Sequence, residues 1–173
     1  TLDGTLFPYT TLFRSCIRFG ARSFILCGSS MGSAVSAIVG AQRSDVAALA
    51  LMATLPDSLL IWKGMSEKQQ NAWRESAYLE HDGGRVSFAI VEDAGRFDVA
   101  RDLLSFPGPL LAVHGGRDEL IPLKLVDDLL KRRNAETRLE VLEEADHRFS
   151  DDADREKLLE LICRFIENAA ELS

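Results

Sequence analysis

The sequence predicts an α/β fold in which helices flank a mainly parallel sheet and a small helical cap is inserted between two strands. The first observation behind this prediction is that short apolar runs alternate with longer segments whose apolar residues recur at helical spacing. The second is that the short runs are almost continuously apolar, which is typical of strands covered on both faces. Strands that alternate with helices in this way form parallel sheets.

The predicted elements can be placed in chain order. Four apolar runs are predicted strands, at residues 23–27, 46–52, 109–114 and 137–142. Three segments are predicted helices, at residues 33–42, 123–133 and 154–172. The first helix is rich in small residues and can therefore lie close to the sheet. The other two place their apolar residues on one face, as an amphipathic helix does.

Residues 53–106 interrupt the alternation and are too long for a plain connection. We therefore expect a small cap over about residues 55–106. Ser66 and Gln69 fit a capping box, in which two side chains satisfy amides of the first helical turn, so a helix should begin at Ser66.

Composition and charge exclude several classes of protein. The chain has 173 residues, enough for one domain with a sizeable core, and a formal net charge of -7 without a Lys/Arg-rich run. Nucleic-acid binding depends largely on neutralising phosphates, so we expect none. No apolar run approaches the roughly 20 residues that a membrane span needs. The three cysteines, Cys16, Cys27 and Cys163, lack the spacing of a metal site, and we expect buried free thiols in a reducing compartment, the cytoplasm.

The most informative motif is Gly28-Ser29-Ser30-Met31-Gly32, a G-x-S-x-G between a predicted buried strand and a predicted helix. This context is the one in which the motif has chemical meaning, because a tight strand-to-helix turn exposes the central serine. The helix N-terminus offers amides and a partial positive charge to an oxyanion. Ser30 is therefore a candidate nucleophile, and the Met31 backbone amide a candidate oxyanion donor.

A serine nucleophile needs a base and a carboxylate that orients the base. His147 follows the fourth predicted strand and Asp118 follows the third. Because parallel strands end at one edge of the sheet, both should meet Ser30 there. Glu119 is an alternative acid. Asp146 is a weaker one, since neighbours in sequence rarely face each other.

From Cys16 onward the sequence resembles the second half of an α/β hydrolase, on three motifs: GSSMG, HGGRDELIP and ADHRF. The resemblance implies Ser30 as nucleophile, Asp118 as acid and His147 as base, with no metal or organic cofactor. It also implies that the second oxyanion donor comes from a loop before the nucleophile strand, and we expect that donor to be missing from this chain. His114-Gly115-Gly116 is similar to the HGG oxyanion motif of some lipases. That motif precedes the nucleophile in the chain, whereas this tripeptide follows Ser30, so we do not assign it that role.

Several other residues have a structural interpretation. We expect His114 to be a strand-end histidine with satisfied hydrogen bonds, and His81 to be exposed. Trp62, Trp73 and Tyr78 could line an acyl pocket or form the core of the cap.

The segment from Thr5 to Ser15, TLFPYTTLFRS, resembles the translation of a short-read sequencing adapter. We therefore interpret residues 1–15 as a non-native leader and residues 16–173 as the C-terminal part of one domain, with Cys16–Gly20 as the end of a helix. In such a fragment residues 23–27 would be left as an apolar edge strand, which favours aggregation.

The functional hypothesis is a serine hydrolase that acts on ester or thioester bonds of a small-molecule acyl substrate. One alternative is that the chain is an inactive fragment of such an enzyme. A peptidase or an acyltransferase of the same fold is another. A noncatalytic binding protein is disfavoured, because all three positions carry the required chemistry.

Overall fold

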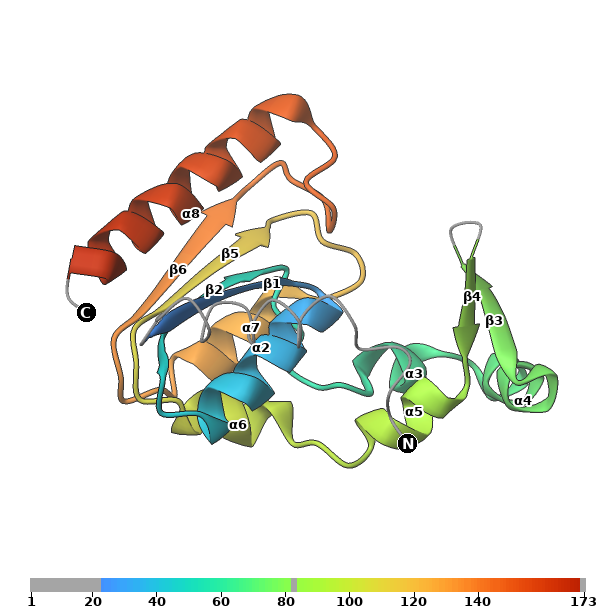
Figure 1. Ribbon diagram of the computed structural model, residues 1–173. Helices are drawn as coiled ribbons and strands as arrows, with labels where there is room; N and C mark the ends of the chain where they lie inside the picture. Colours follow the sequence, from blue (N-terminus) through green and yellow to red (C-terminus); the bar gives the residue numbers. More distant parts are fainter. Residues whose placement is uncertain (1–22, 82–83, 172–173) are drawn as a thin grey trace.

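The computed structural model describes residues 23–81 and 84–171 (Figure 1). The proposed leader at residues 1–15, the helix end expected at residues 16–20 and the thiol of Cys16 lie outside these residues. The side chain of His81 also lies outside the part of the chain that is described.

Within the described residues the central sheet has four strands, all parallel, in the order β1-β2-β5-β6. The strands are β1 (Phe24–Ser29), β2 (Val46–Met52), β5 (Leu110–Gly115) and β6 (Thr137–Leu142). The four predicted strands and the parallel sheet are confirmed. The bounds of the second and fourth match the prediction, while β1 continues to Ser29 and β5 to Gly115. All four strands therefore end at one edge, where their loops gather.

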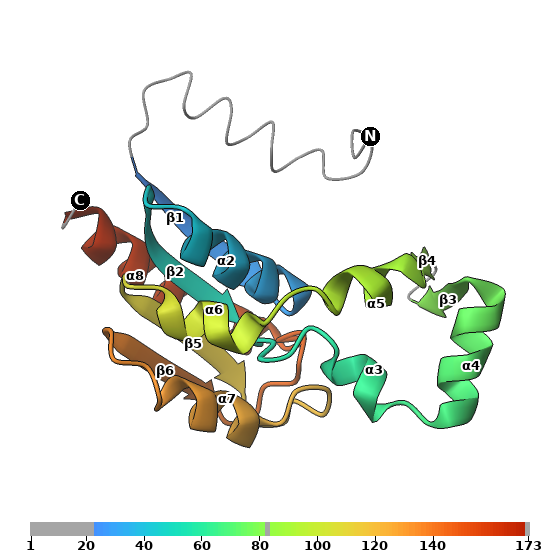
Figure 2. The same ribbon diagram turned by 90° about the horizontal axis from the view of Figure 1, so that it is seen from below.

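Helices cover both faces of this sheet (Figures 1 and 2). They are α2 (Met31–Gln42), α6 (Val99–Ser105) and α7 (Leu123–Leu130) on one face and α8 (Asp152–Glu171) on the other. Alternate residues of β2 show why two layers form: Leu49 and Leu51 pack in the core beneath α2 and α6, whereas Ala50 packs with Leu158 and Ile162 of α8. The sheet is thus buried between two apolar cores.

Between β2 and β5 the chain leaves the sheet and returns. We call residues 57–97 the arm, because they extend away from the sheet in Figures 1 and 2. Its elements are α3 (Leu60–Gly64), α4 (Glu67–Ser76), β3 (Tyr78–His81), β4 (Gly84–Ser87) and α5 (Ala89–Ala94). Strands β3 and β4 pair antiparallel, so the arm contains, beside α3, α4 and α5, a hairpin that the sequence did not predict. The expected capping box is confirmed at the start of α4, where Ser66 and Gln69 satisfy each other's backbone amides.

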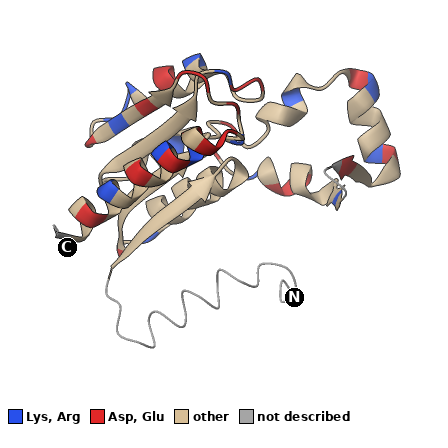
Figure 3. Cartoon of the chain, turned by 90° about the horizontal axis from the view of Figure 1, so that it is seen from above, with Lys and Arg blue, Asp and Glu red and all other residues tan. Residues whose placement is uncertain are grey.

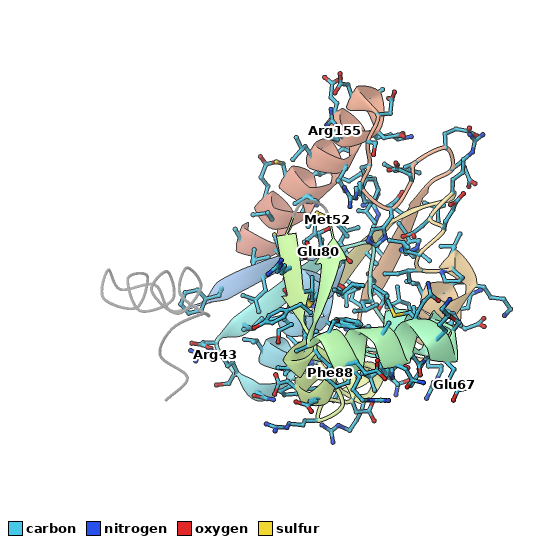
Figure 4. All side chains as sticks on the ribbon, turned by 90° about the vertical axis from the view of Figure 1, so that its right-hand side faces the viewer. Arg43, Met52, Glu67, Glu80, Phe88 and Arg155 are labelled. Carbon is cyan, nitrogen blue, oxygen red and sulfur yellow. The ribbon has the colours of Figure 1, made fainter. Side chains whose placement is uncertain are left out.

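The arm has a small aromatic core of its own. The ring of Trp62 lies 5.9 Å from that of Trp73 and 5.4 Å from that of Phe88, between ring centroids. The guanidinium of Arg74 lies over Trp62 and Phe88, and the Trp73 indole donates to the Val86 carbonyl at 3.1 Å. Figure 4 shows Phe88 beside α4 in this core. These contacts fold the hairpin against α4 and account for both tryptophans without an acyl pocket. Tyr78, by contrast, is exposed.

Strand β1 forms the edge of the sheet, since within the described residues it pairs with β2 alone. Cys27 of β1 and Cys163 of α8 are exposed free thiols, so the prediction of buried cysteines is wrong for both. In the part of the chain that the structure describes, Cys27 lies on the strand that pairs on one side only, which leaves it accessible. Partial burial, and to a smaller degree the charge of Cys163, still raise the pKa of Cys27 above its usual value.

Charged residues of both signs lie along α8 and the arm (Figure 3). Among the helices of residues 23–81 and 84–171, none combines the length and the apolar character required to cross a bilayer.

Candidate active site

Ser30 stands at the sharp turn between β1 and α2. Its backbone angles, φ 52° and ψ -117°, are strained for a residue with a side chain, and its amide donates to the Met52 carbonyl at 2.9 Å. Glycine is needed at position 28, because a Cβ there would lie 2.2 Å from the carbonyl oxygen of Gly32. The turn therefore presents the Ser30 hydroxyl beyond the end of β1, as the G-x-S-x-G motif predicts.

Ser33 fixes this turn to its surroundings. The buried Ser33 hydroxyl donates to the Ser30 carbonyl at 2.5 Å and accepts from the Leu55 amide at 2.8 Å. One side chain thus joins the turn at Ser30 to the loop that follows β2. Ser33 was not predicted from the sequence, where its only signal is a serine in the first turn of a helix.

Asp118 lies in the acid loop, which we define as residues 116–122 after β5. Its carboxylate is fully buried, and its Oδ1 accepts from the amides of Leu120 at 2.9 Å and Ile121 at 2.8 Å. These bonds hold one carboxylate oxygen and leave Oδ2 directed to the sheet edge. Glu119 is exposed, so of the two adjacent acids only Asp118 is built into the site.

His147 lies in the histidine loop, which we define as residues 143–151 after β6. The preceding residue organises this loop: Asp146 Oδ1 accepts from the amides of Arg148 at 3.0 Å and Ser150 at 2.9 Å. Hydrogen bonds from Ser150, and after it from Arg148, hold the pKa of Asp146 below its usual value. Phe149 takes a left-handed conformation, φ 51°, and is buried. Asp146 therefore shapes the loop and does not contact His147 as an acid.

The two loops are joined backbone to backbone. The Gly116 amide donates to the Leu142 carbonyl at 2.8 Å, and the Arg117 amide donates to the Ala145 carbonyl at 3.0 Å. A Cβ at Gly115 would lie 2.4 Å from that Ala145 oxygen, so the approach is possible only with glycine at this position. The HGG sequence thus allows the acid and histidine loops to touch.

The loops bring three predicted side chains into one hydrogen-bonded chain. His147 Nε2 lies 3.0 Å from Ser30 Oγ, and His147 Nδ1 lies 2.8 Å from Asp118 Oδ2. Because an ionised carboxylate can only accept, Nδ1 carries the ring proton and Nε2 is left to accept from the serine hydroxyl. We call this arrangement the Ser–His–Asp chain.

The N-terminus of α2 adds an electrostatic feature. Met31 is the first residue of α2, where helix geometry leaves amides without intrahelical partners and places partial positive charge. Its amide follows Ser30 directly, and its side chain is 54% exposed at the same edge. An anion formed at Ser30 would therefore lie beside this helix end.

His114 only partly meets its expectation. It is fully buried at the end of β5, as expected, and its Nε2 lies 2.9 Å from the Ile121 carbonyl. Its Nδ1, however, has no hydrogen-bond partner among the described residues. The prediction of a satisfied histidine is wrong for this ring nitrogen, because His114 is completely buried where no described group donates to Nδ1 or accepts from it.

Neither a protein-family model nor a curated protein matches the sequence. The structure resembles that of mouse alpha/beta hydrolase domain-containing protein 10, with a TM-score of 0.71 at 20% identity over 99% of this chain and 74% of that chain. It also resembles Est1E from Butyrivibrio proteoclasticus, solved with ferulic acid (TM-score 0.66, 20% identity, 93% of this chain and 70% of that one). A third is the monoacylglycerol lipase of Paleococcus ferrophilus (TM-score 0.65, 14% identity, 93% and 74%). The chain has the α/β-hydrolase fold and spans 70% to 74% of these three chains.

Proposed function

We propose that this chain carries the catalytic residues of a serine hydrolase that cleaves ester or thioester bonds of small acyl substrates. The observation that supports the proposal is the Ser–His–Asp chain, with contacts of 3.0 and 2.8 Å, at a strand-to-helix turn that exposes its serine. Among the similar structures are one described as an esterase domain, from Rhodothermus marinus, and one described as a monoacylglycerol lipase, which favours carboxylic esters as the substrate class.

In the proposed reaction Ser30 Oγ attacks the acyl carbonyl carbon while His147 Nε2 takes the hydroxyl proton. Asp118 holds the ring in the required tautomer and stabilises the imidazolium. The carbonyl oxygen becomes an oxyanion beside the Met31 amide. Collapse breaks the bond to the alcohol or thiol, which leaves with the proton from His147. Water, deprotonated by His147, then attacks the acyl-serine and releases the acid and free Ser30.

Side chains, one backbone amide and water supply every group in these steps, so the proposed mechanism needs no cofactor. Met31 is the one oxyanion donor that we assign. Removing a single donor from an oxyanion hole costs about 10²- to 10³-fold in kcat, so turnover by this chain should be slow if no second donor completes the hole.

The test compares Ser30→Ala with Ser29→Ala. Both remove a serine hydroxyl from GSSMG, but only Ser30 belongs to the Ser–His–Asp chain. Hydrolysis of p-nitrophenyl butyrate should fall about 10⁴-fold or more in Ser30→Ala and stay near wild type in Ser29→Ala. A fluorophosphonate probe should label wild type and Ser29→Ala at one site. Equal labelling of Ser30→Ala would refute the proposal.

The same assay separates the alternatives. Stoichiometric labelling of Ser30 without turnover would indicate an inactive fragment with an intact nucleophile. Turnover of a p-nitroanilide at a rate similar to that of the ester would indicate a peptidase, and product transfer to an added alcohol in preference to water would indicate an acyltransferase.

A further inference from the structure

His114 is a second buried histidine beside the proposed catalytic acid. It is the penultimate residue of β5 and lies four residues before Asp118. Both side chains are completely buried, and His114 Nε2 lies 3.4 Å from Asp118 Oδ2 and 2.9 Å from the Ile121 carbonyl oxygen. The ring therefore contacts the acid loop at two points, the carboxylate of Asp118 and the backbone of Ile121.

The partners of His114 determine its tautomer. The Ile121 carbonyl can only accept a hydrogen bond, so at 2.9 Å the Nε2 atom must carry a proton. In the neutral ring the lone pair is then on Nδ1, the atom without a partner among the described residues. A buried polar atom without a partner is unfavourable, and an apolar residue of similar size would avoid that cost. Packing alone therefore does not explain a histidine at this position.

The contacts of the Asp118 carboxylate indicate what the His114 ring contributes. Oδ1 is held by the amides of Leu120 and Ile121, both in the acid loop, and Oδ2 accepts from His147. His114 Nε2 lies 3.4 Å from Oδ2 and donates to the carbonyl of Ile121 in the same loop. Because His114 belongs to β5, this ring connects the acid loop to a strand of the central sheet.

We propose that His114 is a positioning residue: its Nε2 donates to the Ile121 carbonyl and lies 3.4 Å from Asp118 Oδ2, which anchors the acid loop to β5 so that Oδ2 stays directed at His147 Nδ1. The inference rests on the proposed function for its effect on turnover. Its structural part, the tautomer and the link from His114 through Asp118 to His147, can be measured independently of activity.

The first experiment uses nitrogen-15 NMR of the imidazole rings, which is simple because the chain has three histidines. At about pH 8, where an ordinary histidine is neutral, His114 should show the Nε2-protonated tautomer. His147 should show an Nδ1-protonated tautomer with a low-field proton bound to Asp118. A His114 ring protonated at Nδ1 alone would overturn the proposal.

The second experiment compares His114→Gln, whose amide can place a donor near the Nε2 position, with His114→Leu, which cannot donate. In His114→Leu, kcat for the aryl ester should fall about 10- to 100-fold, because the buried Ile121 carbonyl loses its donor and the acid loop loses its link to β5, while KM changes little. In His114→Gln, kcat should stay within about threefold of wild type. Val113→Ala, a buried neighbour outside the site, controls for stability: it should lower the melting temperature without lowering kcat measured well below it.

Failure of this inference can be told from failure of the proposed function. If wild type neither hydrolyses esters nor reacts with the fluorophosphonate, the proposed function is refuted. The role of His114 is then tested by the NMR signal of the low-field proton on His147 Nδ1. Its loss in His114→Leu but not in His114→Gln supports positioning. An unchanged His147 spectrum in His114→Leu, unchanged kcat in an active protein, or equal losses in both variants would overturn it.

Discussion

Two adjacent acids, Asp118 and Glu119, have opposite surroundings. The Asp118 side chain is buried under two backbone amides and faces His147, while Glu119 is exposed. Asp118→Asn keeps the shape of the side chain. Its NH₂ group can donate to His147 Nδ1, however, and this stabilises the ring tautomer that lacks the Nδ1 proton. Ester turnover should then fall about 10³- to 10⁴-fold. Glu119→Gln, the matched control, should stay within about twofold. A larger loss in Glu119→Gln than in Asp118→Asn, measured as kcat/KM, would transfer the acid role to Glu119.

The lowered pKa of Asp146 should make the free energy of unfolding depend on pH. Its pKa is lowered, mainly by the hydrogen bonds from Ser150, so its ionised form stabilises the folded histidine loop. A lowered carboxyl pKa gives stability that is present above the unfolded pKa, near 3.8, and is lost as the pH falls through the folded pKa. Wild type should therefore melt at a higher temperature than Asp146→Asn at neutral pH, and the two melting temperatures should converge as the pH falls through the folded pKa of Asp146. Melting curves that differ equally at every pH would contradict this assignment.

At the scale of elements, Arg133 joins three segments that meet behind β5 and β6. The buried guanidinium donates to the carbonyls of Leu103 and Gly108 and to the Thr137 hydroxyl, and lies over the ring of Phe106. All of these partners are neutral, and burial lowers the pKa of Arg133 below its usual value.

Arg133→Ala should strip the hydrogen bonds from two buried carbonyls and lower the free energy of unfolding by about 3 kcal/mol. Arg132→Ala removes the neighbouring exposed arginine and should cost less than about 0.5 kcal/mol. Urea denaturation of the two variants checks the difference. A similar small loss in both would show that Arg133 does not hold these segments together.

A helix or strand can be predicted from the sequence when it is buried, because burial requires a recognisable pattern of apolar residues. The central strands were predictable from short, almost continuous apolar runs, and α8 from apolar residues that recur at helical spacing. Strands β3 and β4 were not, since each has four residues and their side chains are mostly exposed. Helix α2 begins two residues before the prediction, because the turn at Ser30 leads directly into it.

The candidate site was also predictable only in part. Ser30, Asp118 and His147 could be chosen from sequence because each follows a predicted strand and has a characteristic residue type. The supporting residues could not. Ser33 and His114 act through contacts with Leu55 and Ile121, whose proximity depends on the folded loops. The exposure of Cys27 depends on which strands pair with β1, and a continuous apolar run does not reveal that.

At the scale of the whole molecule, the edge strand β1 and the adjoining surface of α2 leave apolar groups accessible. Met31 and Val35, one turn apart on α2, are 54% and 50% exposed. Edge strands with accessible apolar surface recruit other chains.

We therefore expect concentration-dependent self-association in sedimentation experiments. Val35→Lys should weaken it, whereas Leu159→Lys, an equally exposed leucine on α8, should not. A chain that remains monomeric at every concentration, or two lysine variants with the same effect, would contradict the assignment of β1 and α2 as the associating surface.

The aromatic core of the arm has an optical consequence. The chain has two tryptophans, and Trp62 and Trp73 both lie in the arm, in contact with each other. Selectively excited indole fluorescence therefore reports only on this segment, while far-ultraviolet circular dichroism is dominated by the central sheet and the helices around it. The two signals, followed in one denaturation, resolve the arm from the rest of the molecule without any introduced label. Coincident midpoints would mean that arm and sheet unfold as one cooperative unit, and an earlier midpoint in fluorescence would mean that the arm opens alone.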